Sequence, residues 1–409
     1  MMGTLVISSR PGLERAADII RRGGLVAVPT ETVYGLGTNA LDEAAVRKIY
    51  EVKGRPEVKA LSIMVPDAGA MDSYCLDVPG QARLLAEKFW PGPLTIILRS
   101  GESIPSIVRA GGATVGLRCP DHELTLEALR LSGVPLAAPS ANPSGEESPK
   151  TAEKVLEYFD GKIDAVIDGG PCGIGRESTI IDMSTTPYRI LRSGALPERE
   201  IVSALRQSMT VVGITGGTGS GKTTALKVLR GMGALIIDCD AVYHELLKSS
   251  ENIKRELSAA FGNVMTAGEI DTKKLGRIVF GDGRELEKLN EITHRYIDLE
   301  VERRLDEHAM RGGSLAAIDA IALVESGLGK KTDLTVAVTA PVERRVERIM
   351  LREGIGENYA RLRISAQKSD AFFMQSCDYV LHNDADMESF NKKCNVFFTE
   401  VLKNVKREK

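Results

Sequence analysis

Paired cysteines, long apolar runs and an excess of basic residues are all missing from this sequence of 409 residues. Its six cysteines are scattered at positions 75, 119, 172, 239, 377 and 394 without a Cys-x-x-Cys pair, a pattern typical of reduced thiols rather than of a disulfide framework or a zinc site. The longest apolar runs, such as LTIIL and LTVAVTA, are too short to cross a bilayer, and the start MMGTLVISSRPG lacks the apolar run of a secretory signal. We therefore expect a cytoplasmic protein with no membrane contact.

Charge is nearly balanced along the chain, whose formal net charge is −3. Up to Ser208 there are 23 Lys and Arg against 26 Asp and Glu, and 30 of each follow. Neither half is therefore a basic nucleic-acid-binding module by bulk charge. The hydrophobic share of 43% is that of a globular protein, and the chain is too long for one ordinary core, so two domains are expected.

Short β-rich apolar runs alternate with helical patterns throughout, which predicts α/β architecture in both halves. The predicted strands of the first half are GLVAVPT, ALSIMV, LTIIL, TVGLRCP, PLAAPS, DAVIDGG, STIIDM and YRILRSG, and helices should begin near Asp42, Pro79, His122 and Thr151. So many strands for so few helices predict a mixed, twisted sheet rather than a doubly wound one. A helix over 197–207 and a strand from Thr210 predict a joint near 207–209, which divides the chain into domains 1–207 and 208–409.

The segment GGTGSGKT matches the pattern G-x-x-x-x-G-K-[ST] between an apolar strand and a helix, the context that a phosphate-binding loop requires. Backbone N–H groups of such a loop surround the β-phosphate of a nucleotide, while Lys222 reaches the β and γ oxygens and the Thr223 hydroxyl can ligate Mg²⁺. A glycine-rich turn with a chance lysine is the alternative, which the flanking strand and helix disfavour. The predicted ATP contacts are Gly216, Gly217, Thr218, Gly219, Ser220, Gly221, Lys222, Thr223 and Thr224.

Two acids, Asp238 and Asp240, follow the next apolar run, ALII. The ends of parallel strands are where α/β sheets place their chemistry, and an acid there can orient a hydroxyl acceptor and take its proton. Asp240 also precedes the helical AVYHELL, where aspartate is favoured as an N-cap. The pattern alone leaves both roles open.

The second half resembles the dephospho-CoA kinase family over roughly residues 210–405. The shared segments are GITGGTGSGKTT, GALIIDCDAVYHELL, EIDTKKLGRIVF, LEKLNEITH, ESGL, RIMLRE and CDYVLHN. That family transfers the γ-phosphate of ATP to the 3′-hydroxyl of dephospho-CoA, so the resemblance implies a P-loop kinase with a parallel sheet and a helical lid and substrate region. It implies that Asp240 is the acceptor-side base and that Arg352 opens the mobile lid and stabilises charge on the transferred group. It also implies an ATP contact at Asn383 and substrate contacts at His294 and Glu325.

Three departures from that family's pattern are present. Arg295 replaces the proline after His294, Ile321-Ala322-Leu323 replaces Pro-Leu-Leu, and Arg345 replaces a glutamine in the helix before the lid. We expect none of them to touch the phosphate loop or Asp240, so they bear on the acceptor pocket. Most charges of RRVERIMLRE are expected to form a solvated helix with Glu–Arg pairs, and only Arg352 is assigned a function.

The first half lacks a P-loop, but polar clusters abut its apolar runs in VPTETVYGLG, KGRPEVKAL and APSANPSG. Lys53 and Arg55 flank Gly54 at the expected end of the helix DEAAVRKIYEVKG, where a glycine C-cap and nearby cations are favoured. Spacing alone therefore permits a purely structural role for this pair.

These clusters, together with WPGPLTIIL, VGLRCPDH, ESTIID and ILRSG, resemble the Sua5/YrdC family of L-threonylcarbamoyladenylate synthases over about residues 5–200. The resemblance implies that threonine, bicarbonate and ATP give pyrophosphate and threonylcarbamoyl-AMP, the donor for threonylcarbamoyladenosine in tRNA. The attacking carboxylate is already an anion, so the site must gather negative groups rather than supply a strong base. The implied cations are Lys53 and Arg55, assigned to catalysis, with Lys59, Arg118 and Arg192. The implied polar contacts are Ser140, Asn142 and Ser178, with Thr30, Thr32 and Tyr34 at the threonine end.

Two alternatives remain. The first half could bind tRNA without making the adenylate, although its small negative charge argues against tight backbone binding. The second half could phosphorylate another small hydroxyl substrate. The expected partners are ATP with Mg²⁺, threonine, bicarbonate and dephospho-CoA, and a transient tRNA or tRNA-modifying complex.

Overall fold

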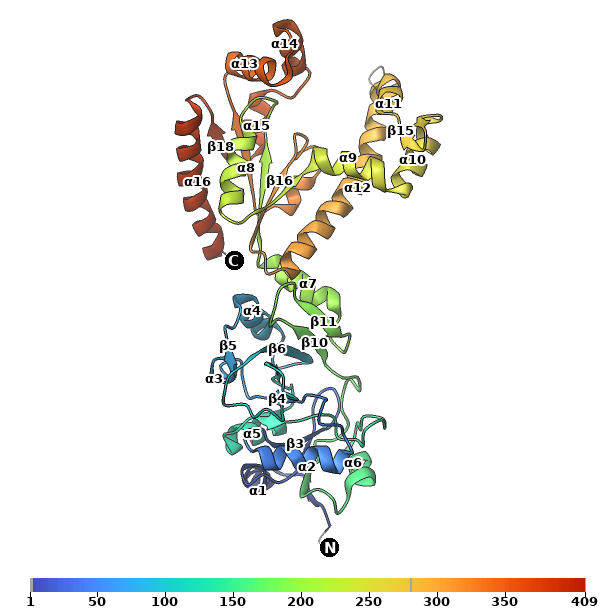
Figure 1. Ribbon diagram of the computed structural model, residues 1–409, viewed down its shortest axis with the longest axis vertical. Coiled ribbons are helices and arrows are strands. Elements are labelled where there is room, and N and C mark those ends of the chain that lie inside the picture. The colour runs from blue at the N-terminus through green and yellow to red at the C-terminus, as the bar shows by residue number, and fades with distance from the viewer. Residues whose placement is uncertain (1–2, 280–281, 409) are drawn as a thin grey trace. The chain divides into compact units, whose positions relative to one another are not determined.

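The computed structural model describes residues 3–279 and 282–408, which form two compact units (Figure 1). Unit 1 contains the chain up to residue 205 together with 310–312, and unit 2 contains 206–309 and the chain from 313 onward. The predicted joint lies between helix α7 (Glu198–Gln207) and strand β12 (Thr210–Thr215). None of the helices in the described ranges combines the length and the apolar character needed to span a bilayer.

Unit 1 is built on an eleven-stranded mixed sheet with the strand order β1-β9-β2-β3-β8-β4-β7-β6-β10-β11, and β5 pairs with β6. Its strands are β1 (Leu5–Ile7), β2 (Val26–Val28), β3 (Gly35–Asn39), β4 (Ser62–Met64), β5 (Cys75–Leu76), β6 (Leu94–Ser100), β7 (Thr114–Arg118), β8 (Leu136–Ala137), β9 (Ala165–Ile167), β10 (Thr179–Asp182) and β11 (Arg189–Arg192). Strand β6 pairs with β10 in parallel and with β7 in antiparallel orientation, so the predicted mixed sheet is confirmed. All eight predicted strands are present, whereas β1, β3 and β5 were not predicted.

The helices of unit 1 are α1 (Arg10–Arg21), α2 (Glu43–Lys53), α3 (Ala70–Tyr74), α4 (Gly80–Phe89), α5 (Glu123–Ser132), α6 (Ala152–Phe159) and α7. The four predicted helix starts are confirmed as the N-caps of α2, α4, α5 and α6. Asp42 begins α2 by accepting the N–H groups of Ala44 and Ala45, and α2 ends at Gly54, whose φ of 58° is left-handed. Helix α1 was not predicted, although its buried residues Leu13, Ala16, Ala17 and Ile20 repeat with helical spacing.

Unit 2 contains a five-stranded parallel sheet with the order β13-β16-β12-β17-β18, as predicted. Its strands are β12, β13 (Leu235–Asp238), β16 (Leu315–Asp319), β17 (Leu334–Thr339) and β18 (Tyr379–His382), and a short hairpin joins β14 (Met265–Thr266) and β15 (Glu269–Ile270). The helices are α8 (Lys222–Gly231), α9 (Cys239–Ser249), α10 (Glu251–Phe261), α11 (Thr272–Val279), α12 (Gly283–Met310), α13 (Val342–Glu353), α14 (Glu357–Ser365), α15 (Asp370–Ser376) and α16 (Met387–Glu408), with a 3₁₀ turn η1 (Leu328–Lys331).

Both faces of the parallel sheet are covered. Val212 and Ile214 of β12 pack with residues of α8 and α16, which lie together on one face of the sheet (Figure 1). Val211 packs on the opposite face with Val301 of α12. Burial on both faces explains why TVVGIT is apolar almost throughout instead of alternating, and the carboxyl ends of the strands remain available for chemistry.

Candidate active sites

A cavity of about 280 Å³ opens in unit 1 beside strands β3, β4, β6, β7, β8, β10 and β11. Six of the residues that the sequence predicted for the first site line it: Tyr34, Arg55, Arg118, Ser140, Ser178 and Arg192. They come from segments far apart in the sequence, and the sheet brings them together. The other predicted residues of this half, Lys53, Lys59, Asn142, Thr30 and Thr32, lie outside the lining.

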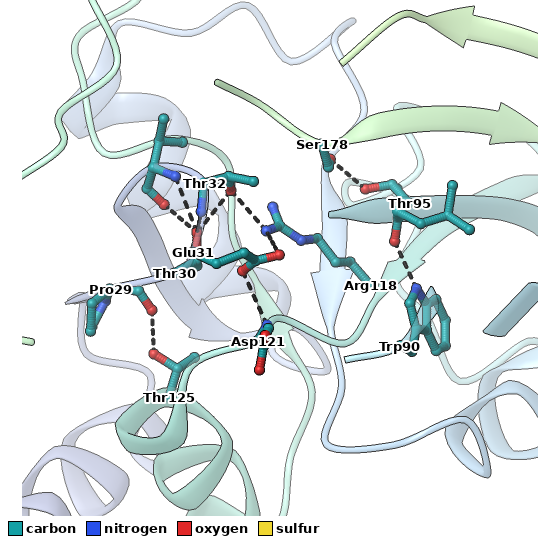
Figure 2. Close-up of polar contacts among 12 residues, drawn as sticks. Pro29, Thr30, Glu31, Thr32, Trp90, Thr95, Arg118, Asp121, Thr125 and Ser178 are labelled. Carbon is teal, nitrogen blue, oxygen red and sulfur yellow. Dashed lines mark hydrogen bonds and ion pairs between the residues drawn. The ribbon is translucent and has the colours of Figure 1, made fainter. Parts of the chain in front are cut away.

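Arg118, at the end of β7, is held in place by Glu31, which the sequence reasoning did not select (Figure 2). Its Nη2 donates to a Glu31 carboxylate oxygen at 2.8 Å and to the Thr32 hydroxyl at 2.7 Å, and the second Glu31 oxygen accepts the N–H of Asp121 at 3.0 Å. The Arg118 side chain is 8% exposed, yet its Nε has no hydrogen-bond partner among the described residues. A buried donor without a partner is costly, so this nitrogen is available to a ligand in the cavity.

Two further guanidinium groups face the same cavity. Arg192 donates from Nε to the Ser178 carbonyl at 2.9 Å and from Nη2 to the Ser178 hydroxyl at 3.1 Å, and that hydroxyl also bonds Thr95 at 2.8 Å. Arg55 donates from Nη2 to the Ala60 carbonyl at 3.0 Å. Burial lowers the pKa of both Arg55 and Arg192. Because three guanidinium groups face one cavity, the cavity suits a ligand with several negative groups.

Lys53 supports the cavity wall instead of lining the cavity. Its Nζ donates to the Ser140 carbonyl at 2.5 Å and to the Asn142 carbonyl, and the residue is 3% exposed. Burial, and then the charge of Arg55, lowers the pKa of Lys53 to about 7. Asn142 in turn donates from Nδ2 to the Glu146 carbonyl at 2.7 Å. The Gly54 C-cap that spacing permitted is present, and Lys53 has this additional contact with the Ser140–Asn142 segment.

Tyr34 is fully buried, and its hydroxyl is occupied by the backbone of the neighbouring loop. It donates to the Gly170 carbonyl at 2.8 Å and accepts the N–H of Gly169 at 3.2 Å. Burial raises the pKa of Tyr34, so the phenol stays neutral. Tyr34 therefore shapes the cavity as a neutral group, and Thr30, which bonds Thr32 at 2.8 Å, lies behind Arg118 in the same hydrogen-bonded chain.

In unit 2 the strand–loop–helix context of the predicted phosphate loop is present, from β12 through residues 216–221 to α8. Gly216, Gly219 and Gly221 have φ values of 134°, 79° and 107°, which residues with a Cβ rarely adopt. The Lys222 ammonium donates to the Gly216 carbonyl at 2.8 Å. Burial lowers the pKa of Lys222, and the carboxylates of Asp319 and Asp240 oppose this effect, so both acids lie close enough to act on it.

Three acids follow the strands beside this loop. Asp238, at the end of β13, accepts the N–H of Asp240 at 3.0 Å and of Ala241 at 3.1 Å, so it is the N-cap of α9. The capping role that the sequence left open for Asp240 is therefore wrong. Asp240 lies exposed in the first turn of α9, where its carboxylate is free of that role.

Asp319, which the sequence reasoning missed, ends β16 in register with Asp238. Burial raises the pKa of Asp319 to about 6, opposed by the charge of Lys222, and its Oδ1 is buried without a hydrogen-bond partner among the described residues. The sequence does contain a signal for Asp319, because this acidic residue ends the apolar run LAAID. The motif ESGL, on which the family resemblance rests in this region, begins after Asp319 and does not include it.

Helix α13 meets the phosphate loop through two arginines that lie about one turn apart, Arg345 and Arg348. Arg348 donates from Nη1 to the Gly219 carbonyl at 3.1 Å and from Nη2 to Asn383 Oδ1 at 3.3 Å, while Asn383 Nδ2 donates to the Ser220 carbonyl at 2.8 Å. Arg345 donates from Nε to the Thr218 carbonyl at 3.0 Å. The expectation that Arg345 does not touch the phosphate loop is therefore wrong, as is the solvated-helix interpretation for Arg345 and Arg348.

Arg352 is exposed and pairs with Glu353 at 2.6 Å, and its charge also contributes to the lowered pKa of Lys222. The departure at Arg295 is explained by an ion pair with Glu256 of α10, which also accepts the Tyr296 hydroxyl at 2.9 Å. At the second departure the Ile321 carbonyl accepts the Thr215 hydroxyl at 3.0 Å, and Ala322 is half-buried beside it.

His294 and Glu325, both predicted for the substrate region, lie within electrostatic range of one another. Burial lowers the pKa of His294, and the Glu325 carboxylate opposes that shift. The two residues lie on α12 and in the turn that follows β16, so the fold brings them into electrostatic range across a long stretch of sequence.

A P-loop that leads from a central parallel strand into a helix, with acids at the adjoining strand ends, defines unit 2 as a P-loop nucleotide-binding domain. Unit 1 is a mixed-sheet domain with an arginine-lined cavity. The Sua5/YciO/YrdC family model, described as telomere recombination, matches residues 18–194, and the dephospho-CoA kinase family model matches residues 210–389. The chain belongs to the Sua5/YciO/YrdC family in its first half and to the dephospho-CoA kinase family in its second half.

Relatives of each half agree with this assignment. Over 203 residues the chain is 48% identical to the threonylcarbamoyl-AMP synthase of Pyrococcus abyssi, covering 48% of this chain and 60% of that protein. It is 41% identical to a putative threonylcarbamoyl-AMP synthase of Methanocaldococcus jannaschii, covering 46% of this chain and 88% of the relative. It is 34% identical to the dephospho-CoA kinase of Corynebacterium glutamicum, covering 48% of this chain and 100% of the relative. The chain thus spans less than two thirds of the length of the Pyrococcus protein.

Proposed function

We propose that the chain is a bifunctional enzyme. Unit 1 converts threonine, bicarbonate and ATP into L-threonylcarbamoyl-AMP and pyrophosphate, and unit 2 transfers the γ-phosphate of ATP to the 3′-hydroxyl of dephospho-CoA. One observation carries the proposal: each half contains its own site, a cavity lined by three arginines in one and a phosphate loop with an adjacent acid in the other. The names of the relatives of each half support the same two reactions.

In unit 1 the reaction begins when the amine of threonine bonds to the carbon of bicarbonate and water leaves, which gives N-carboxythreonine. Its new carboxylate oxygen attacks the α-phosphorus of ATP, a P–O bond forms, and the α–β bridging bond breaks to release pyrophosphate. No side chain has to remove a proton in that step, so the contribution of Arg55, Arg118 and Arg192 is to hold several anions together and to stabilise the charge that develops at phosphorus. The Arg118 Nε, which has no hydrogen-bond partner within residues 3–279 and 282–408, is the donor we assign to the threonine end.

In unit 2 the acceptor hydroxyl gives its proton to Asp240 while its oxygen bonds to the γ-phosphorus and ADP departs. Lys222 at the start of α8 and Arg352 near it supply positive charge to the phosphates. The Thr223 hydroxyl and the Asp319 Oδ1, which no hydrogen bond from the described part of the chain satisfies, are oxygen ligands of the kind that Mg²⁺ prefers, so these residues fit the Mg²⁺ that accompanies ATP. When bound, that ion neutralises charge on the phosphate oxygens.

The two products lead to separate uses. Threonylcarbamoyl-AMP is an activated acyl donor for tRNA threonylcarbamoyladenosine, so a tRNA or a tRNA-modifying complex is its proposed recipient. The second reaction completes coenzyme A. We place both in the cytoplasm, in keeping with six cysteines that all remain unpaired.

The test is to assay the purified chain for both products. Pyrophosphate release should require threonine, bicarbonate and ATP and should proceed without RNA, since an RNA-binding module would release none. Phosphate transfer to dephospho-CoA should exceed transfer to adenosine or AMP, since a kinase for another hydroxyl would reverse that order. Absence of either product would remove the corresponding half of the proposal.

A further inference from the structure

The side chain of Arg345 is a buried cation packed against the phosphate loop. It is 3% exposed and reaches three different acceptors. Nε donates to the Thr218 carbonyl at 3.0 Å, Nη2 donates to Gln367 Oε1 at 3.2 Å, and Nη1 pairs with Asp370 at 3.0 Å. Arg345 therefore joins helix α13, the segment after α14 and the start of α15 to one residue of the loop.

Gln367 completes the hold on that residue. Its Oε1 accepts the Thr218 N–H at 2.9 Å, and its Nε2 donates to the Thr218 hydroxyl at 2.6 Å. Because Arg345 also donates to Oε1, the orientation of the Gln367 amide is fixed. The N–H, the carbonyl and the hydroxyl of Thr218 are thus all engaged by Arg345 of α13 and by Gln367, which lies between α14 and α15.

The glycines of the loop make room for this arrangement. A Cβ on Gly217 would lie 2.1 Å from Arg345 Nη2 and 2.7 Å from its Cζ. A Cβ on Gly219 would lie 2.9 Å from the Arg345 carbonyl oxygen. The guanidinium and the backbone of α13 therefore pack directly on loop backbone, and this contact needs residues without side chains at both positions.

We propose that Arg345 is a positioning residue: with Gln367 it forms a clamp on Thr218, held in place by Asp370, that presets the phosphate loop for ATP and ties it to helices α13 and α15. This inference rests on the proposed kinase function of unit 2. Only a guanidinium supplies donors in a rigid fork to three acceptors, and the glutamine that the family usually has at this position could not bridge them. A preset loop loses less freedom when ATP binds, so the clamp strengthens nucleotide binding rather than the chemical step.

Asp370 has a separate role in the clamp. Its carboxylate neutralises the buried guanidinium and fixes Nη1. Asparagine at this position keeps an oxygen acceptor but removes the charge. Asp370→Asn should therefore disturb the loop less than Arg345→Ala does, because the contacts to Thr218 and Gln367 remain.

The experiment compares the parent chain with Arg345→Ala, Arg345→Lys, Asp370→Asn and the control Arg361→Ala. Arg361 is an exposed arginine of α14 that pairs only with Glu357, four residues earlier, among the described residues. Three readouts are taken: ATP affinity by calorimetry without acceptor, KM for ATP and kcat with dephospho-CoA, and hydrogen exchange of residues 216–222. Melting of each variant shows whether it is folded.

We expect Arg345→Ala to weaken ATP binding and raise KM by about tenfold, with a smaller effect on kcat and faster exchange in residues 216–222. Arg345→Lys should show the same direction, because one ammonium cannot bridge three acceptors. Asp370→Asn should change ATP affinity and loop exchange in the same direction but by less than Arg345→Ala, and the control Arg361→Ala should stay within about threefold of the parent. If Arg345→Ala does not fold, the lysine variant decides the question.

Unchanged ATP affinity and unchanged loop exchange in a folded Arg345 variant would overturn the clamp. A loss confined to kcat would overturn it as well, because the residue would then act on the chemistry. If the parent binds ATP but does not phosphorylate dephospho-CoA, the proposed function fails, while weaker ATP binding and faster loop exchange in the Arg345 variants still support the clamp.

Discussion

At residue 53 an amine is buried against two backbone carbonyls, and burial lowers its pKa from 10.5 to about 7. Between these two values the unfolded chain holds a proton that the folded chain lacks. Stability therefore rises with pH across this window, and below pH 7 the fold carries the full cost of a buried ammonium. The titration of Lys53 should therefore be measurable as a change of the free energy of unfolding with pH.

Lys53→Met removes this titration. We expect the free energy of unfolding of the parent, minus that of the variant, to rise by about 2–3 kcal/mol between about pH 7 and pH 9. Trp90 is the single tryptophan of the chain and is buried in unit 1, so its fluorescence during urea unfolding reports this unit. A difference that does not change with pH would show that Lys53 keeps its proton in the fold.

Glu31 does not line the cavity. It acts on substrate binding indirectly, because its carboxylate orients the Arg118 guanidinium. Glu31→Gln keeps the size of the side chain but removes the charge that orients the guanidinium, so the KM for threonine in pyrophosphate release should rise by about tenfold. Glu43→Gln, at an exposed ion pair with Arg47 on α2, is the matched control and should leave the KM unchanged. Equal effects of the two substitutions would contradict the role given to Glu31.

At the scale of one element, two acidic residues at the start of α9 have different roles: Asp238 caps the helix, and Asp240 is the proposed base. Asp238→Ala removes the N-cap and should cost about 1 kcal/mol of stability, measured by denaturation of unit 2. Asp240→Asn should leave stability nearly unchanged while lowering dephospho-CoA phosphorylation by about a hundredfold or more, because the amide cannot take the hydroxyl proton. Normal turnover in Asp240→Asn would exclude Asp240 as the base.

The elements that sequence predicts well are those whose local chemistry agrees with their place in the fold. Helix α2 has its Asp42 cap and its Gly54 end, and β12 is an apolar run followed by a phosphate loop. Strand β3, GLGTN, was missed because its two glycines lack β preference, and the two-residue β5 because, unlike β8, it has no longer apolar run around it. Pairing with neighbours in the sheet forms both, and pairing cannot be read from a local pattern.

The sites divide in the same way. Motifs identified Arg55, Arg118 and Arg192, and the sheet gathered them around one cavity. Motifs could not show that the Lys53 ammonium bonds backbone carbonyls. Nor could they show that Arg345 lies on the side of α13 that contacts the phosphate loop, and not on its solvent-exposed side. Such contacts depend on which side of an element meets another segment of the chain.

At the scale of the whole molecule, each half has its own core and its own predicted site residues. We therefore expect that cutting the chain between Gln207 and Met209 yields two folded fragments, each with its own activity. About two hundred residues are enough for an independent core. Fragments that are folded by circular dichroism but inactive until mixed would show that one half depends on the other.

The central claim is that one chain holds two independent active sites, and a crossed pair of variants tests it most directly. In the full chain, Lys222→Ala should lower dephospho-CoA phosphorylation by roughly 10²–10³-fold and leave threonine-dependent pyrophosphate release unchanged, because the phosphates lose a fixed cation in unit 2 alone. Arg55→Ala should do the reverse. Both products are measured on the same preparation of each variant. Loss of both activities in either folded variant, or of neither, would contradict the account.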